Sequence, residues 1–183
     1  MQKLPEIFNR FKSDIDKEMQ SIISAGNLPL YDMLKYHMGW IDEKGNKGDY
    51  GKGKFLRATL CILAYISTLK EEENEKRLSV MPLAGSIELI HNFSLIHDDI
   101  QDNDKQRRHR PTLWYIWGKP QAINAGTTMK VLANLAITRL DNYDISCEKQ
   151  LEVFRIINES CLKMLEGKYL DIEFESKSEV SMD

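Results

Sequence analysis

Three aspartates and a histidine in one stretch of the chain have the types and spacing of a metal-binding face. Asp98 and Asp102 are four residues apart, which on a helix is about 6 Å of rise, and Asp99 lies beside them. His91 falls within about 40° of both around the helix axis. Carboxylate oxygens suit Mg²⁺, which usually completes its shell with water and phosphate oxygens. The spacing therefore predicts a Mg²⁺ site that meets a phosphorylated ligand.

The same three carboxylates have a second interpretation as the solvated end of an otherwise apolar helix. Carboxylates near a helix C-terminus oppose the helix dipole, so this position is unfavourable for a purely structural acidic end. Short motifs also match by chance. The turn that carries Asp98, Asp99 and Asp102, which we call the acidic turn, does not by itself decide between the two interpretations.

Basic residues follow the acidic turn within eight positions: Lys105, Arg107, Arg108 and Arg110. Arginine forks pair well with the oxygens of a diphosphate, and the alternative is salt bridging of these bases to Asp102 and Asp104. A second basic pair, Lys54 and Arg57, follows the glycines at 51 and 53 and lies three residues apart on one helix face. A helix start with two cations is typical of an anion site.

The elements that must position these residues are helices. Apolar residues recur at intervals of three and four almost everywhere, and no run alternates as a strand would, so the predicted fold class is all-α. Residues 1–183 are expected to form a single all-α domain. The predicted helices span Pro5–Ser24, Tyr31–Met38, Lys54–Leu69, Leu83–Asp102, Ala122–Leu140 and Ile145–Phe174, with a bend after Pro111 and a close-packing point or kink at Gly126.

Composition excludes several classes of protein. The 183 residues carry 25 Lys and Arg against 28 Asp and Glu, a formal charge of −3, which argues against a strongly basic nucleic-acid binder. The three cysteines form no CxxC or Cys/His cluster, so neither a disulfide framework nor a zinc site is indicated. No stretch approaches a membrane span or a secretory signal, and we expect a soluble, cytoplasmic protein.

The acidic turn belongs to a longer compound motif that resembles a known family, the trans-isoprenyl diphosphate synthases or polyprenyl synthetases. The likeness covers about Gly51 to Asp171. It is strongest in Glu88-Leu89-Ile90-His91, Ser94-Leu95-Ile96-His97-Asp98-Asp99-Ile100-Gln101-Asp102, Arg107-Arg108, Arg110-Pro111-Thr112-Leu113-Trp114, Trp117-Gly118 and Gln121-Ala122-Ile123-Asn124-Ala125-Gly126. The resemblance implies an isoprenoid synthase-type helical bundle.

The resemblance also implies roles for individual residues. Asp98 and Asp102, with Asp99 in support, match the positions that bind the Mg²⁺ ions holding an allylic diphosphate, and Arg107 matches a position that grips the same diphosphate. Four further positions match the site for the diphosphate of isopentenyl diphosphate: Lys54, Arg57, His91 and Arg108.

The implied activity is a prenyltransferase reaction in which isopentenyl diphosphate attacks an allylic carbocation and lengthens the chain by five carbons. At the positions that set chain length, the aromatic Phe93 and the small Ser94 match the pattern of geranylgeranyl diphosphate synthases. The alternative is that Phe93 simply packs in the core. The family resemblance further leads us to expect a homodimer.

Several positions depart from the family pattern. Phe55 replaces a usual arginine, Ala58 a usual proline and Lys168 a usual glutamine. A second aspartate-rich motif is missing, and the two-residue spacing of the acidic residues from 171 to 175 cannot form an equivalent face on a helix. Because Ser181 would cap a further helix, we expect a truncated chain, the N-terminal portion of a prenyltransferase, whose own activity stays open.

Two other functions are compatible with this pattern. A non-catalytic regulatory subunit of a heteromeric prenyl diphosphate synthase would explain the missing second motif, but it has no evident need for an intact acidic turn. A terpene cyclase also binds an allylic diphosphate through aspartates, but it needs no site for isopentenyl diphosphate. Lys54, Arg57 and His91 match such a site and therefore favour a chain-elongating enzyme.

Overall fold

The computed structural model describes residues 6–24, 26–70 and 76–175 and divides the chain into two units, Met1–Ile145 and Ser146–Asp183. Each unit is described by itself. The expected helix start at Pro5 and the expected cap at Ser181 lie outside the described residues.

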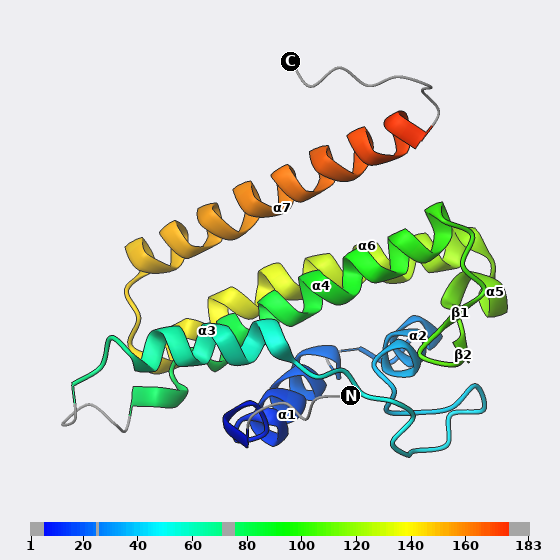
Figure 1. Ribbon diagram of the computed structural model, residues 1–183. Coiled ribbons are helices and arrows are strands. Elements are labelled where there is room, and N and C mark those ends of the chain that lie inside the picture. Colours follow the sequence, from blue (N-terminus) through cyan, green and yellow to red (C-terminus); the bar gives the residue numbers. More distant parts are fainter. Residues whose placement is uncertain (1–5, 25, 71–75, 176–183) are drawn as a thin grey trace. The chain divides into compact units, whose positions relative to one another are not determined.

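The first unit is built from helices in the order of Figure 1. Its helical elements are η1 (Glu6–Phe8), α1 (Lys12–Ile23), α2 (Pro29–His37), α3 (Leu56–Ile66), α4 (Met81–Gln101), α5 (Leu113–Trp117), α6 (Lys119–Thr138) and η3 (Arg139–Tyr143). A two-stranded antiparallel hairpin, β1 (Gln106–Arg107) and β2 (Arg110–Pro111), joins α4 to α5. The all-α prediction is confirmed, with this hairpin as a small addition.

Helices α4 and α6 pack side by side along their length at the centre of the unit, and α3 and α1 pack on α4 (Figure 1). The inward faces carry fully buried apolar side chains at helical spacing: Ile15, Met19, Leu89, Ile96, Met129 and Ile137. Burying a side chain of this size stabilises the fold by about 1.5–3 kcal/mol. This packing fixes α4, and with it every residue of the acidic turn.

Gly126 is a point of close approach between α6 and α4. A Cβ atom at this position would lie 2.5 Å from Cδ2 and Nε2 of His97, so only glycine leaves room for the imidazole ring. The ring also packs against Phe93, whose ring centroid lies 4.8 Å away in an edge-to-face arrangement. Of the two roles predicted for Gly126, the structure shows close packing.

Two segments differ from the sequence-based expectation. The bend after Pro111 contains the short helix α5, and the basic stretch before it forms the hairpin β1–β2. Arg108 and His109 form the two-residue turn with φ angles of 52° and 63°. Positive φ at both turn positions is the pattern of a type I′ turn, which matches the twist of the strands, and the usual Asn-Gly or Asp-Gly signal is absent here.

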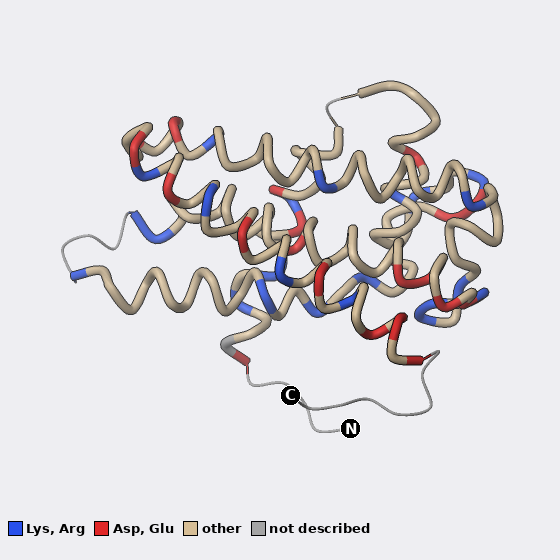
Figure 2. Tube along the Cα trace, turned by 90° about the horizontal axis from the view of Figure 1, so that it is seen from above, with Lys and Arg blue, Asp and Glu red and all other residues tan. Residues whose placement is uncertain are grey.

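The second unit consists, in its described part, of the single helix α7 (Cys147–Glu175). Among the described helices none is both long and apolar enough to cross a membrane. Basic and acidic positions are interspersed along the trace of the chain in Figure 2, in keeping with its nearly balanced charge.

Candidate functional site

The acidic turn lies at the C-terminal end of α4, where the helix stops at Gln101 and Asp102 caps it. The backbone N–H of Asp102 donates to the carbonyl oxygen of Asp98 at 2.8 Å, so the two residues are one turn apart. Asp98 is half-buried and Asp102 is exposed. The predicted spacing of these carboxylates is therefore present in the folded chain.

Asp99 has different surroundings from its two neighbours. Its side chain is buried, and its Oδ1 accepts a hydrogen bond from Nε of Arg107 at 2.7 Å. Burial raises the pKa of Asp99 to about 6, although the bond from Arg107 acts in the opposite direction. Asp99 thus anchors the first arginine of the hairpin to α4.

The donor set of the acidic turn fits a Mg²⁺ ion that is shared with a ligand. Asp98 and Asp102 offer hard carboxylate oxygens, while Asp99 is engaged by Arg107. Within the described ranges, no three His, Cys, Asp or Glu side chains gather as a metal-binding group. Two carboxylates leave most of an octahedral shell to water and phosphate oxygens, which is the usual way in which Mg²⁺ binds at phosphate sites.

Three positive groups, which we call the cationic cluster, act electrostatically on His91 of α4: Arg57 from α3, and Arg107 and Arg108 from the hairpin. Burial and these three guanidinium groups lower the pKa of His91 to about 4. The imidazole is therefore neutral at pH 7. Residues far apart in the sequence therefore contribute positive charge near His91.

The start of α3 supplies one side of the cationic cluster. Phe55 precedes the helix in the left-handed conformation, with φ of 50°, and its ring is buried. The flanking Lys54 and Arg57 are exposed. Phe55, which replaces a usual arginine of the family pattern, therefore anchors the loop to the core. On the other side, Nη2 of Arg108 lies 3.5 Å from the position of a Cβ at Gly53, so the hairpin and the glycine loop are in close proximity.

Glu88 belongs to this site, although the sequence reasoning assigned it no role. The residue is 3% exposed on α4, and the positive charges of Arg57 and Arg108 act on its carboxylate. Burial raises the pKa of Glu88, and the nearby backbone N–H of Ala58 in α3 acts against that rise. The signal in the sequence was a charged residue placed in the apolar part of a helix.

Other basic residues near the site are engaged elsewhere. Both terminal nitrogens of Arg110 donate at 2.9 Å, Nη1 to the carbonyl oxygen of Tyr36 and Nη2 to that of Ile41, and its guanidinium lies 3.9 Å from the centroid of the Tyr36 ring. Nζ of Lys52 donates to Oδ2 of Asp16 at 3.0 Å. Arg110, which the sequence grouped with the phosphate-binding arginines, therefore ties the hairpin to the end of α2 and to the loop that follows it.

The two candidate chain-length residues lie one turn before the acidic turn. Phe93 is 5% exposed and packs against His97. Ser94 is half-buried, and its hydroxyl donates to the carbonyl oxygen of His91 at 2.8 Å.

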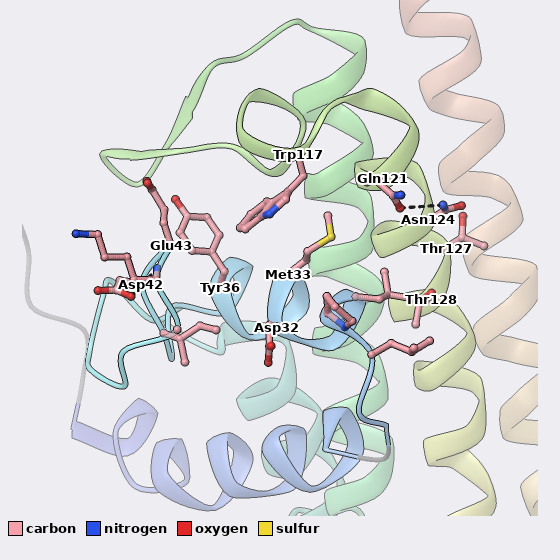
Figure 3. A pocket seen from close by; sticks show the side chains of 16 residues that line it. Asp32, Met33, Tyr36, Asp42, Glu43, Trp117, Gln121, Asn124, Thr127 and Thr128 are labelled. Carbon is pink, nitrogen blue, oxygen red and sulfur yellow. Dashed lines mark hydrogen bonds between the residues drawn. The ribbon is translucent and has the colours of Figure 1, made fainter.

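Of two pockets in the first unit, one lies away from the predicted site residues and the other adjoins them. A wide one of about 850 Å³ lies between α2, the following loop and the start of α6, with Tyr36 and Trp117 on one side and Gln121, Asn124, Thr127 and Thr128 on the other (Figure 3). None of the predicted site residues lines it. A small polar one of about 20 Å³ adjoins Asp99, Arg107 and Arg108 and has room for a single water molecule.

The sequence of this chain is similar to the sequences of known proteins. The family model described as "Polyprenyl synthetase" matches residues 40–183. A (2E,6E)-farnesyl diphosphate synthase of Mycobacterium tuberculosis is 36% identical over 151 residues, which cover 82% of this chain and 39% of that protein. A geranylgeranyl diphosphate synthase of the same organism is 29% identical over 177 residues, covering 97% of this chain and 48% of the relative.

Solved structures give a similar result. The crystal structure of a polyprenyl synthetase from Streptomyces coelicolor A3(2) superposes with a TM-score of 0.82 at 31% identity, covering 96% of this chain and 49% of that one. The chain therefore spans about half the length, or less, of the proteins that it resembles here.

Proposed function

Because this chain belongs to the polyprenyl synthetase family, we propose that it is part of a short-chain prenyltransferase that condenses isopentenyl diphosphate with an allylic diphosphate. The observation that carries this proposal is the position of the cationic cluster beside the acidic turn. Arg107, bonded to Asp99, belongs to the hairpin that joins the two groups.

The allylic half of the site is the acidic turn. Asp98 and Asp102 would hold Mg²⁺, which, when bound, neutralises the allylic diphosphate and stabilises it as a leaving group. Arg107 is oriented by Asp99 and would hold the same diphosphate through its remaining guanidinium N–H groups. Asp99 then acts through Arg107, a more specific role than the metal support predicted from the sequence.

The isopentenyl half consists of two arginines of the cationic cluster, Arg57 and Arg108, together with Lys54 and His91. Arg57, Arg108 and Lys54 would bind the second diphosphate through charge-assisted hydrogen bonds. His91 would join them as a neutral group, because its pKa of about 4 leaves it uncharged at pH 7. The two diphosphates would then lie on neighbouring parts of α4.

The reaction needs no nucleophile from the protein. Departure of the allylic diphosphate leaves a carbocation, the isopentenyl double bond attacks it, and loss of a proton completes a chain longer by five carbons. The work of the side chains is to bind and orient two anions against each other. We further propose geranylgeranyl diphosphate as the product, on the pattern of Phe93 and Ser94, and a homodimer as the assembly.

The test is calorimetric titration of the chain with geranyl diphosphate, with and without MgCl₂. We expect Mg²⁺ to raise the affinity at least tenfold in the natural chain and to leave it unchanged in Asp98→Ala. Asp141→Ala, an exposed acidic position on η3, is the matched control and should keep the Mg²⁺ effect. An equal Mg²⁺ effect in Asp98→Ala and in the natural chain would refute the assignment of the acidic turn.

A second titration separates the two halves of the site. Isopentenyl diphosphate should bind without added Mg²⁺, and Arg57→Ala should weaken this binding while leaving the Mg²⁺-dependent binding of geranyl diphosphate in place. Loss of both by Arg57→Ala would argue against two distinct diphosphate positions.

A further inference from the structure

Asp16, in the middle of helix α1, accepts hydrogen bonds on both of its carboxylate oxygens. Oδ1 accepts from Nε1 of Trp40 at 2.7 Å, and Oδ2 accepts from Nζ of Lys52 at 3.0 Å. A third bond reaches Oδ2 from Nε2 of Gln20, one turn further along α1, at 3.0 Å. The side chain of Asp16 is 14% exposed, so its ion pair with Lys52 is shielded from much of the solvent. One carboxylate therefore connects α1 to two positions of the segment that leads from α2 to α3.

The two positions bonded to Asp16 belong to backbone stretches that pass close to each other. The backbone N–H of Tyr50 donates to the carbonyl oxygen of Gly39 at 3.0 Å. Gly39 has a φ of 77°, and a Cβ atom there would lie 3.2 Å from the backbone nitrogen of Lys52. A side chain would crowd this approach, which glycine allows. Asp16 thus bonds to one side chain from each of two adjacent stretches of backbone.

The glycine loop, residues 51–54, leads towards α3 and carries one of the predicted diphosphate-binding residues. Its two glycines have no side chains that could hold the backbone in place, and Lys54 is exposed. Lys52 supplies such a side chain through its ion pair with Asp16. The buried ring of Phe55 follows at the other end of the loop. Lys54 therefore lies between an anchor to α1 and an anchor to the core.

The glycine loop also lies beside the hairpin of the candidate site. Nη2 of Arg108 lies 3.5 Å from the position that a Cβ atom would occupy at Gly53. Under the proposed function, Lys54 and Arg108 bind the same diphosphate. Groups that are already held in the bound arrangement bind more tightly, because less conformational freedom is lost on binding. A displacement of the loop would therefore weaken the binding of a diphosphate that these two groups share.

From this arrangement we infer that Asp16 is a positioning residue: through Lys52 it holds the glycine loop so that Lys54 binds a diphosphate together with Arg108. The inference rests on the proposed function, since it assumes that Lys54 belongs to the site for isopentenyl diphosphate. Asp16 acts through the loop and touches no substrate, and its negative charge would repel a diphosphate.

The sign of the effect distinguishes positioning from charge. Asp16→Asn keeps an oxygen that can accept from Trp40 but removes the ion pair with Lys52. If Asp16 acted only through its charge, the substitution would tighten the binding of an anion. The experiment is calorimetric titration with isopentenyl diphosphate at fixed ionic strength, without divalent cations. We expect Asp16→Asn to bind about fivefold more weakly, equivalent to about 1 kcal/mol.

A second ligand and a second background separate positioning from a general structural role. Asp16→Asn should leave the Mg²⁺-dependent binding of geranyl diphosphate unchanged, because that ligand is assigned to the acidic turn. In a Lys52→Met background, which already lacks the ion pair, Asp16→Asn should weaken isopentenyl diphosphate binding less than about twofold. Glu18→Gln is the matched control and should leave both affinities unchanged: Glu18 is also on α1, has a side chain that is 17% exposed, and pairs with Arg139 at 3.3 Å.

Each outcome decides the question. Three results overturn the positioning role and leave the proposed function standing: equal or tighter isopentenyl diphosphate binding by Asp16→Asn, an equal loss in the Lys52→Met background, or an equal loss of geranyl diphosphate binding. Absence of isopentenyl diphosphate binding by the natural chain overturns both.

A second pair of variants decides the question if circular dichroism shows that Asp16→Asn is unfolded. Lys52→Met is then compared with Lys47→Met, which removes an exposed lysine from the same connection between α2 and α3. A loss of about fivefold in isopentenyl diphosphate affinity that is confined to Lys52→Met supports the positioning role. Equal affinities of the two variants overturn it.

Discussion

Arg107 donates through Nε to the buried Oδ1 of Asp99 at 2.7 Å, and this bond joins the hairpin to the acidic turn. The aspartate is 3% exposed at its side chain and the arginine 29%. If the ion pair were broken, the guanidinium of Arg107 could be hydrated by solvent, whereas the buried carboxylate of Asp99 could not.

Asp99→Asn is expected to change the free energy of unfolding at pH 7.5 by no more than about 1 kcal/mol. Burial raises the pKa of Asp99 to about 6 in spite of Arg107, so the ionised carboxylate contributes no net stability at this pH. Urea denaturation measures the difference. Asp32→Asn, which removes the exposed Asp32–Lys35 pair on α2, is the control and should change stability by less than about 0.5 kcal/mol. A loss of more than about 3 kcal/mol in Asp99→Asn would mean that the ion pair outweighs the burial cost.

Gly126→Ala should destabilise the fold by about 1–3 kcal/mol, because the new Cβ would meet the His97 ring at 2.5 Å and that ring is also packed against Phe93. Thermal unfolding followed by circular dichroism tests this expectation. Thr127→Ala, at the exposed neighbouring position on α6, is the control and should be neutral or slightly stabilising. Equal melting temperatures of the two variants would show that the ring moves aside freely.

The sequence predicted the acidic turn well because its geometry is local. Asp98 and Asp102 are one turn apart on any helix, and the strong apolar period of α4 placed that helix within two residues of its observed bounds. The close-packing role of Gly126 could be suggested from a glycine inside a helical pattern. These features depend on neighbours within a few positions along the chain.

What the sequence could not predict depends on distant neighbours. The bond from Arg107 to Asp99 requires the hairpin, and the hairpin turns at Arg108 and His109, neither of which is a usual turn residue. Glu88 is buried in the folded chain, where α3 and α1 pack on α4. Nor does spacing reveal that Arg110 binds backbone carbonyls while its neighbours face the site.

Arg110→Lys should lower the free energy of unfolding by about 2 kcal/mol. A lysine cannot reach both Tyr36 and Ile41 with a planar fork, nor stack on the Tyr36 ring as the guanidinium does. Chemical denaturation provides the measurement, with Arg77→Lys at an exposed position as the control. Unchanged stability in Arg110→Lys would show that one hydrogen bond to a carbonyl oxygen is sufficient to hold the hairpin.

The pH dependence of stability should identify His37, a half-buried residue, as a neutral imidazole. Burial, followed by the charges of Arg108 and Arg107, lowers its pKa to about 3, and its Nε2 is buried. As the pH falls below 6.5, His37 binds a proton in the unfolded chain but not in the folded chain. The free energy of unfolding therefore decreases on acidification. Between pH 7.5 and pH 5 this single group should remove about 2 kcal/mol.

His37→Asn removes that proton and should therefore show a pH dependence shallower by about 2 kcal/mol over the same interval. Asp99 has the opposite effect, since a raised carboxyl pKa adds stability as the pH falls below about 6, but it is present in both proteins and cancels in the comparison. Urea denaturation at pH 7.5, 6 and 5 supplies the values. His109→Asn changes an exposed turn histidine for a residue that tolerates its φ of 63°, and it should keep the steep profile of the natural chain. Parallel profiles for His37→Asn and the natural chain would mean that His37 accepts its proton in the folded state.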